Sequence, residues 1–108
     1  MNNMRFYGKS LLFIGAHPDD IELGCGAMIA DIQGTCDIHC LTLSDNQKNP
    51  DLGNLVAEHD ASMAILGLRP DQVELGTFET RRFPEQRQEI LEKMLEARRK
   101  YAPEIVFC

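Results

Sequence analysis

The sequence has 108 residues, of which 44% are hydrophobic and 26% are charged. This length allows one domain with its own core, but it is short for a complete α/β enzyme. The formal net charge of −6 argues against nucleic acids and anionic membranes as partners, because both favour a basic face. The chain shows no membrane-length apolar run and no signal-peptide core near its start, so we expect a cytoplasmic protein without a membrane span.

Alternating strands and helices are predicted from the first apolar run onward. Leu11–Ile14 is short and uncharged, which is typical of a strand buried on both faces of a parallel sheet. Pro18 suits the first turn of a following helix, whose free amides Asp19 and Asp20 can cap, and Gly34 ends that helix. The expected packing face of this helix consists of Ile21, Leu23, Met28, Ile29 and Ile32.

The same alternation continues to the end of the sequence. Further strands are predicted over 37–43, 71–75 and 104–108, and further helices over 55–66 and 84–101. In the helix over 55–66, the expected core contacts are Leu55, Ala61, Ile65 and Leu66. Right-handed crossovers then predict an α/β fold with a Rossmann-like parallel sheet of strand order 3-2-1-4 and flanking helices. The topological switch point would lie between the first and fourth strands.

Ionisable side chains gather directly after the first predicted strand. His17, Asp19 and Asp20 fall at its carboxyl end, where open α/β sheets place their chemistry. A histidine and two carboxylates can supply metal ligands and a base together. The alternative is structural: the aspartates cap the helix, and His17 hydrogen-bonds a loop. His39 and His59 are expected to be structural histidines.

The cysteines show no pattern of a disulfide framework or a metal site. They are Cys25, Cys36, Cys40 and Cys108, with no Cys-x-x-Cys pair among them. Free, buried thiols in a reducing compartment are the expected state.

Residues 16–26, AHPDDIELGCG, resemble the signature of the PIG-L/LmbE family of zinc-dependent N-deacetylases. Shorter similarities follow at 41–45 (LTLSD), at Glu58 with 64–68 (AILGL), at 78–81 (FETR) and at 103–107 (PEIVF). The resemblance therefore extends over essentially the whole sequence, in order.

The resemblance implies a reaction and roles for specific residues. His17 and Asp20 would be ligands of Zn²⁺ or another divalent metal, and Asp19 would be the general base. The reaction would be hydrolysis of an N-acetyl group on a small-molecule substrate of the N-acetylglucosamine type, giving acetate and a free amine. Arg81 and Asp45 are candidate substrate contacts, although a surface arginine and ordinary turn chemistry explain them equally well.

The family takes its third metal ligand from a histidine after the strand that matches Glu104–Phe107. The sequence has no such histidine. We therefore expect residues 1–108 to be a single, incomplete deacetylase domain, the N-terminal half of a larger one, with one ligand missing from this chain.

Two other interpretations stay open. The spacing of Gly24, Gly26 and Asp45 is similar to that of a dinucleotide fingerprint, which would make the chain a nucleotide- or sugar-binding module without hydrolytic activity. Ile29 replaces the third glycine of that fingerprint, however, and the glycines come late after the strand. The third interpretation is an inactive structural domain whose fourth strand pairs with another chain, and a homo-oligomer is compatible with the sequence.

Overall fold

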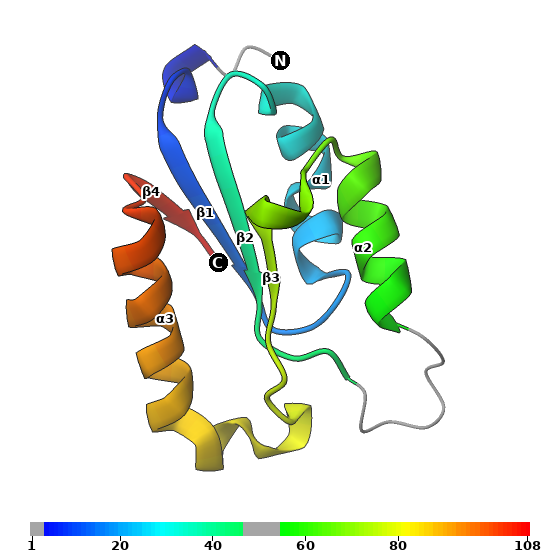
Figure 1. The fold of residues 1–108 in the computed structure, drawn as a ribbon, viewed down its shortest axis with the longest axis vertical. Coiled ribbons are helices and arrows are strands. Elements are labelled where there is room, and N and C mark those ends of the chain that lie inside the picture. Colours follow the sequence, from blue (N-terminus) through cyan, green and yellow to red (C-terminus); the bar gives the residue numbers. More distant parts are fainter. Residues whose placement is uncertain (1–3, 47–54) are drawn as a thin grey trace.

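A computed structural model describes residues 4–46 and 55–108 and contains one parallel four-stranded sheet in the order β3-β2-β1-β4 (Figure 1). The strands are β1 (Ser10–Gly15), β2 (Asp37–Thr42), β3 (Val73–Leu75) and β4 (Ile105–Phe107). The predicted α/β class and the strand order 3-2-1-4 are thereby confirmed. The predicted loop over 44–54 lies partly outside the described residues.

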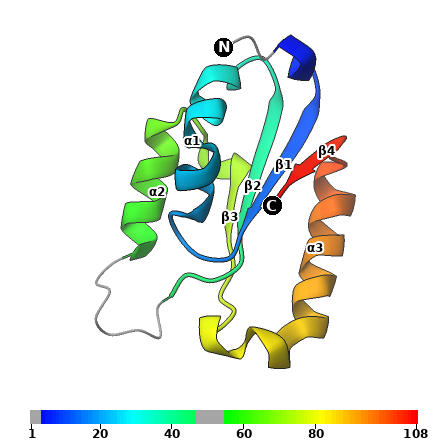
Figure 2. The same cartoon turned by 180° about the vertical axis from the view of Figure 1, so that it is seen from behind.

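Helices cover both faces of the sheet. The α-helices are α1 (Asp20–Ile32), α2 (Leu55–Ile65) and α3 (Arg87–Tyr101), and the 3-10 helices are η1 (Met4–Phe6), η3 (Pro70–Gln72) and η4 (Thr80–Gln86). Seen from either side, α1 and α2 lie on one face and α3 lies alone on the other (Figures 1 and 2). Within the part of the chain that the structure describes, none of the helices has the length and apolar character needed to span a bilayer.

The core is divided by the sheet into two clusters, and β1 contributes to both. Leu11 and Phe13 belong to the cluster under α1 and α2, whereas Leu12 belongs to the cluster under α3. This alternation follows from the two-residue period of a strand. All three side chains are at most 1% exposed, so the prediction of a strand buried on both faces is confirmed.

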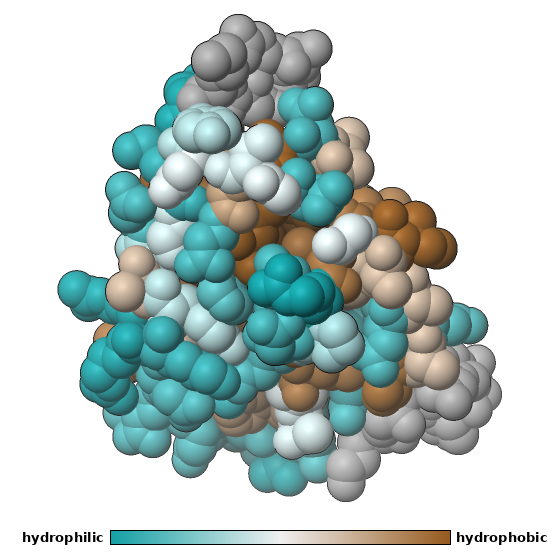
Figure 3. Space-filling view, turned by 45° about the horizontal axis from the view of Figure 1, so that its top comes forward, coloured by the Kyte–Doolittle hydropathy of each residue, from teal (hydrophilic) through white to brown (hydrophobic). Residues whose placement is uncertain are grey.

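The buried faces of α1 and α2 differ from those predicted. Leu23 and Ile65 are each 85% exposed, and Ala61 is also exposed. Each leucine or isoleucine follows a buried residue by two positions, Ile21 in α1 and Met63 in α2, which turns it about 200° away around the helix. Figure 3 shows hydrophobic side chains at the surface among hydrophilic ones on the face in view. The predictions for Leu23, Ala61 and Ile65 were wrong because apolar residues occur on several sides of these helices. Ile21, Ile29 and Ile32 of α1 are buried as predicted.

The segment before α3 also departs from the prediction. A helix was expected to begin at Pro84, but Pro84 lies inside η4 and the α-helix begins at Arg87. Arg82 interrupts η4 with a non-helical backbone, φ −117° and ψ 16°. The third strand is likewise shorter than predicted, because Asp71 belongs to η3, where the buried Gln72 donates a hydrogen bond to the carbonyl of Ile38.

Candidate active site

The loops that follow β1, β2 and β3 come together at one edge of the sheet, at the bottom of Figure 1. Backbone hydrogen bonds join the first two loops, from the amide of Leu43 to the carbonyl of Gly15 and from the amide of Ser44 to the carbonyl of Ala16, both 2.9 Å. The third loop is joined by the amide of Gly76, which donates to the carbonyl of Thr42 at 2.7 Å. This is the carboxyl edge, where open α/β sheets bind ligands.

The turn from β1 into α1 is tight. A Cβ atom on Gly15 would lie 3.0 Å from the side chain of Ile21, so the helix passes directly over the end of the strand. Asp19 has φ 82°, a left-handed conformation that Asp and Asn enter more readily than most residues. A strained non-glycine residue of this kind is a recurring feature of functional sites.

The aspartates do not cap α1 as predicted. Asp19 occupies the N-cap position, but its side chain makes no capping hydrogen bond. Asp20 turns back instead, and its Oδ2 accepts a hydrogen bond of 2.9 Å from the backbone N–H of His17. Side-chain capping therefore does not explain the two aspartates at this turn.

His17 and Asp20 are brought into contact. His17 Nδ1 lies 3.3 Å from Asp20 Oδ2, and the other ring nitrogen, Nε2, is buried without a protein partner among the described residues. His17 Nδ1 and Asp20 Oδ2, at this separation, are a pair of donor atoms that zinc uses. These residues therefore fit a divalent metal as two of its ligands.

The described ranges 4–46 and 55–108 contain no group of three or more His, Cys, Asp or Glu residues arranged to hold a metal ion. A catalytic zinc site takes three protein ligands and keeps one open position. A metal bound by His17 and Asp20 would therefore need one more protein ligand to complete a site of this kind.

The remaining predicted site residues lie on the neighbouring loops. Asp19 is exposed beside the His17–Asp20 pair, Asp45 is half-buried after β2, and Arg81 is exposed in η4. Gly24 and Gly26 lie inside α1, away from the β1–α1 turn where a dinucleotide fingerprint has its glycines. Gly24 has nothing within 4 Å of an added Cβ, so close approach to the sheet does not explain it.

Two groups at this end of the molecule were not predicted. The ring of Phe83, from η4, lies parallel to the His17 imidazole, with ring centroids 5.9 Å apart and planes 7° apart. This contact joins segments far apart in the sequence, and no local pattern predicts it.

The second group lies between α1 and α2. Ser62 donates a 2.6 Å hydrogen bond to Glu22, and Nδ1 of the buried His59 lies 3.9 Å from the same carboxylate. His59 and Met63 are both buried and four residues apart, a helical spacing that could have marked His59 as core-facing. His39 stacks on Tyr101 of α3, with ring centroids 4.0 Å apart. Both histidines thus pack within the fold, but Nδ1 of His39 and both ring nitrogens of His59 are buried without a hydrogen-bond partner among the described residues.

Comparisons with known proteins agree with this geometry. Residues 12–108 match the family described as GlcNAc-PI de-N-acetylase (PIG-L). A segment of 22 residues, 20% of this chain and 12% of the relative, is 77% identical to the "uncharacterized deacetylase YaiS" of Escherichia coli strain K12. The crystal structure of the conserved protein TT1542 from Thermus thermophilus is similar, with a TM-score of 0.70 and 29% identity.

That similarity covers 93% of this chain but only 46% of the Thermus chain, so the chain spans about half the length of its structural relative. The family match runs from β1 through β4 and includes the turn that carries His17, Asp19 and Asp20. The chain therefore belongs to the PIG-L family of GlcNAc-PI de-N-acetylases.

Proposed function

We propose that the protein hydrolyses an N-acetyl group on a small-molecule substrate of the N-acetylglucosamine type, with a divalent metal, zinc in the first instance, at His17 and Asp20. The contact between His17 Nδ1 and Asp20 Oδ2 at the carboxyl end of β1 is the observation that carries this proposal. Membership of the de-N-acetylase family supports it, as does the deacetylase name of the E. coli relative. The third ligand would come from a part of the protein outside residues 1–108.

Each residue of the turn has a separate task in this proposal. The imidazole of His17 and the carboxylate of Asp20 hold the metal, and the hydrogen bond from the His17 amide fixes the carboxylate. Asp19 takes the proton of the attacking water, for which an exposed carboxylate without a capping bond is available. A zinc ion bound there would lower the pKa of water towards about 7 and polarise the amide carbonyl.

Recognition of the substrate would fall to the neighbouring loops. Arg81 offers a planar fork of donors to hydroxyl or anionic groups, and Asp45 offers acceptors to hydroxyl groups. Asp45 follows β2 and Arg81 lies in η4, which follows β3, so both come after the carboxyl ends of strands, as His17 does.

Two substitutions in the turn test the proposal in the protein as its gene encodes it. Asp19→Asn keeps the left-handed backbone but removes the base, so we expect full metal content and a loss of turnover of about 10²–10⁴-fold. Asp20→Asn removes a charged ligand, so we expect loss of both metal and activity. Metal content is measured by elemental analysis, and acetate release is measured with an N-acetylglucosamine glycoside.

The matched control is Asp60→Asn, an exposed aspartate on α2, which should leave metal content and turnover unchanged. Full acetate release by Asp20→Asn after chelation would contradict the proposal, and so would a wild-type protein that binds no divalent metal.

A further inference from the structure

We propose that Phe83 is a positioning residue for the metal ligand His17, an inference that rests on the proposed function. The contact is a parallel stack of the phenyl ring on the imidazole, with ring centroids 5.9 Å apart and planes 7° apart. At this separation the two parallel rings are offset, so the phenyl ring lies beside the imidazole and limits the directions in which it can rotate.

The polar contacts of His17 alone do not fix its ring. Nδ1 lies 3.3 Å from Asp20 Oδ2, and Nε2 is buried without a hydrogen-bond partner among the described residues. A ligating histidine is usually oriented by a hydrogen bond at its second nitrogen. Here the described residues offer an aromatic face in that role.

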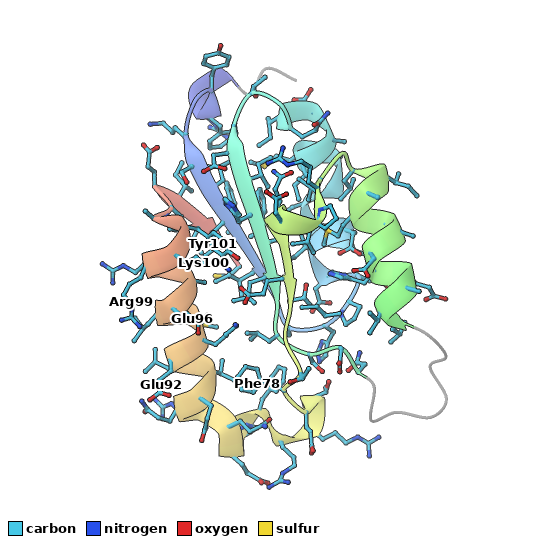
Figure 4. The ribbon with its side chains drawn as sticks, in the orientation of Figure 1. Phe78, Glu92, Glu96, Arg99, Lys100 and Tyr101 are labelled. Carbon is cyan, nitrogen blue, oxygen red and sulfur yellow. The ribbon has the colours of Figure 1, made fainter. Side chains whose placement is uncertain are left out.

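Phe83 is itself held by the core under α3. It packs against the buried cluster of Leu12, Leu41, Leu43 and Ala97. Leu12 belongs to β1, Leu41 belongs to β2, Leu43 directly follows β2, and Ala97 belongs to α3. Phe78 belongs to the same cluster, and Figure 4 shows it between the end of β3 and α3. The phenyl ring beside His17 therefore packs against the core, and this packing restrains its position.

The loop that carries Phe83 is also tied to the end of β2. The hydroxyls of Thr80 and the buried Ser44 share a hydrogen bond of 2.9 Å, and the Thr80 hydroxyl also donates to the side chain of Asn46. Within the loop, the amide of Glu79 donates to Gln86 at 3.1 Å. These hydrogen bonds lie within a few residues of Phe83, and they hold its loop at the carboxyl edge of the sheet.

The consequence concerns metal affinity. If the phenyl ring keeps His17 in its ligating orientation, removal of the ring lets the imidazole rotate, and the metal must then restrain it on binding. Removal of a group that orients a ligand typically weakens metal binding by about 10–100-fold. Phe83 touches the imidazole only by stacking, so we expect the lower end, about tenfold.

The test compares three variants of the protein as its gene encodes it. Phe83→Leu removes the ring and keeps an apolar side chain, Phe83→Tyr keeps the ring, and Phe78→Leu makes the same deletion elsewhere in the same cluster. Zn²⁺ affinity is measured by competition with a chelating dye, and the folded fraction is checked by urea unfolding. We expect affinity about tenfold weaker in Phe83→Leu and within about twofold of wild type in the other two.

A second readout needs no metal. The NMR resonances of the His17 ring protons in the metal-free protein should move in Phe83→Leu and stay in place in Phe78→Leu. Equal Zn²⁺ affinities for wild type and Phe83→Leu would overturn the inference while the proposed function stands, and so would an equal loss in Phe78→Leu. A wild-type protein that does not bind Zn²⁺ would overturn both this inference and the proposed function. The wild-type affinity is therefore measured before any variant is compared.

Discussion

The thiol of Cys40 shows how strongly the interior of this molecule acts on a single side chain. Burial, and secondarily the nearby Glu22 and Cys25, raise the pKa of the Cys40 thiol from 9.0 to about 12. The thiolate is the reactive form, so Cys40 is protected both by its charge state and by its position in the core.

We therefore expect Cys40 to resist iodoacetamide at about pH 8 in the native protein and to react readily in urea. The half-buried Cys25 and Cys36 should react before it. Peptide mass spectrometry after timed labelling measures the three rates. Native labelling of Cys40 as fast as that of Cys25 would be inconsistent with this burial.

Glu22 supports a second prediction at the residue scale. Its side chain is 14% exposed and accepts the 2.6 Å hydrogen bond from Ser62. Ser62→Ala removes a donor from a buried carboxylate, which should lower the free energy of unfolding by about 2 kcal/mol. Urea denaturation measures the loss. The same substitution in a Glu22→Leu background should cost much less, and an equal cost there would mean that the hydrogen bond is not responsible.

Among the elements, the loop after β3 is fitted most closely to its neighbour. A Cβ atom on Gly76 would lie 2.6 Å from the carbonyl oxygen of Leu43, which is backbone and cannot move aside easily. Gly76→Ala should therefore lower the free energy of unfolding by about 2 kcal/mol. Gly24→Ala is the matched control: inside α1, with open space around it, alanine should raise stability by about 0.5–1 kcal/mol. Thermal unfolding of both variants measures these two changes in stability, which should be opposite in sign.

The contact between α3 and β3 has a pH dependence. Lys93 of α3 reaches the sheet, where its Nζ lies 2.6 Å from Glu74 of β3, beside Tyr101. Figure 4 shows Tyr101 on the side of α3 towards the sheet and Arg99 on the outer side. The hydrogen bond and charge of Glu74 raise the pKa of the Lys93 ammonium above its ordinary 10.5, although partial burial opposes them.

Because the pKa of Lys93 is raised in the folded state, its stabilisation is fully present below 10.5 and is lost as the pH rises through the folded value. Lys93→Met should cost about 1 kcal/mol at about pH 8 and progressively less above about pH 11. Urea unfolding of both proteins across this range gives the difference. If the difference in free energy of unfolding between the two proteins does not change with pH, packing of the aliphatic part of Lys93 is responsible, and its charge is not.

At the scale of the whole molecule, the sheet was predictable from the sequence, and the buried faces of the helices were predictable only in part. The uncharged run in β1 and the right-handed crossovers leave few arrangements, so the order 3-2-1-4 follows from them. Leu23 and Ile65 were misplaced because α1 and α2 carry apolar residues on several sides, and tertiary packing chooses among them. Proline is compatible both with the first turn of an α-helix and with η4, where Pro84 lies. The sequence alone therefore did not fix the residue at which α3 begins.

The candidate site, too, was predictable from the sequence only in part. His17, Asp19 and Asp20 are contiguous, and their place after a buried strand was visible in the sequence. The stack with Phe83 was not, because it depends on the path of the loop that carries it from β3 towards α3.

The left-handed backbone at Asp19 also bears on how this position can evolve. Gly, Asn and Asp enter that region readily, whereas other residues pay about 1–2 kcal/mol. A library of all amino acids at position 19, screened first for folded protein, should therefore be enriched in those three. With Asp19 as the proposed base, a second screen for acetate release should keep Asp alone. Recovery of β-branched residues in the folded pool would contradict this. A lineage that drifts from Asp to Asn or Gly would lose turnover while the fold persists, and would survive as a folded, inactive relative.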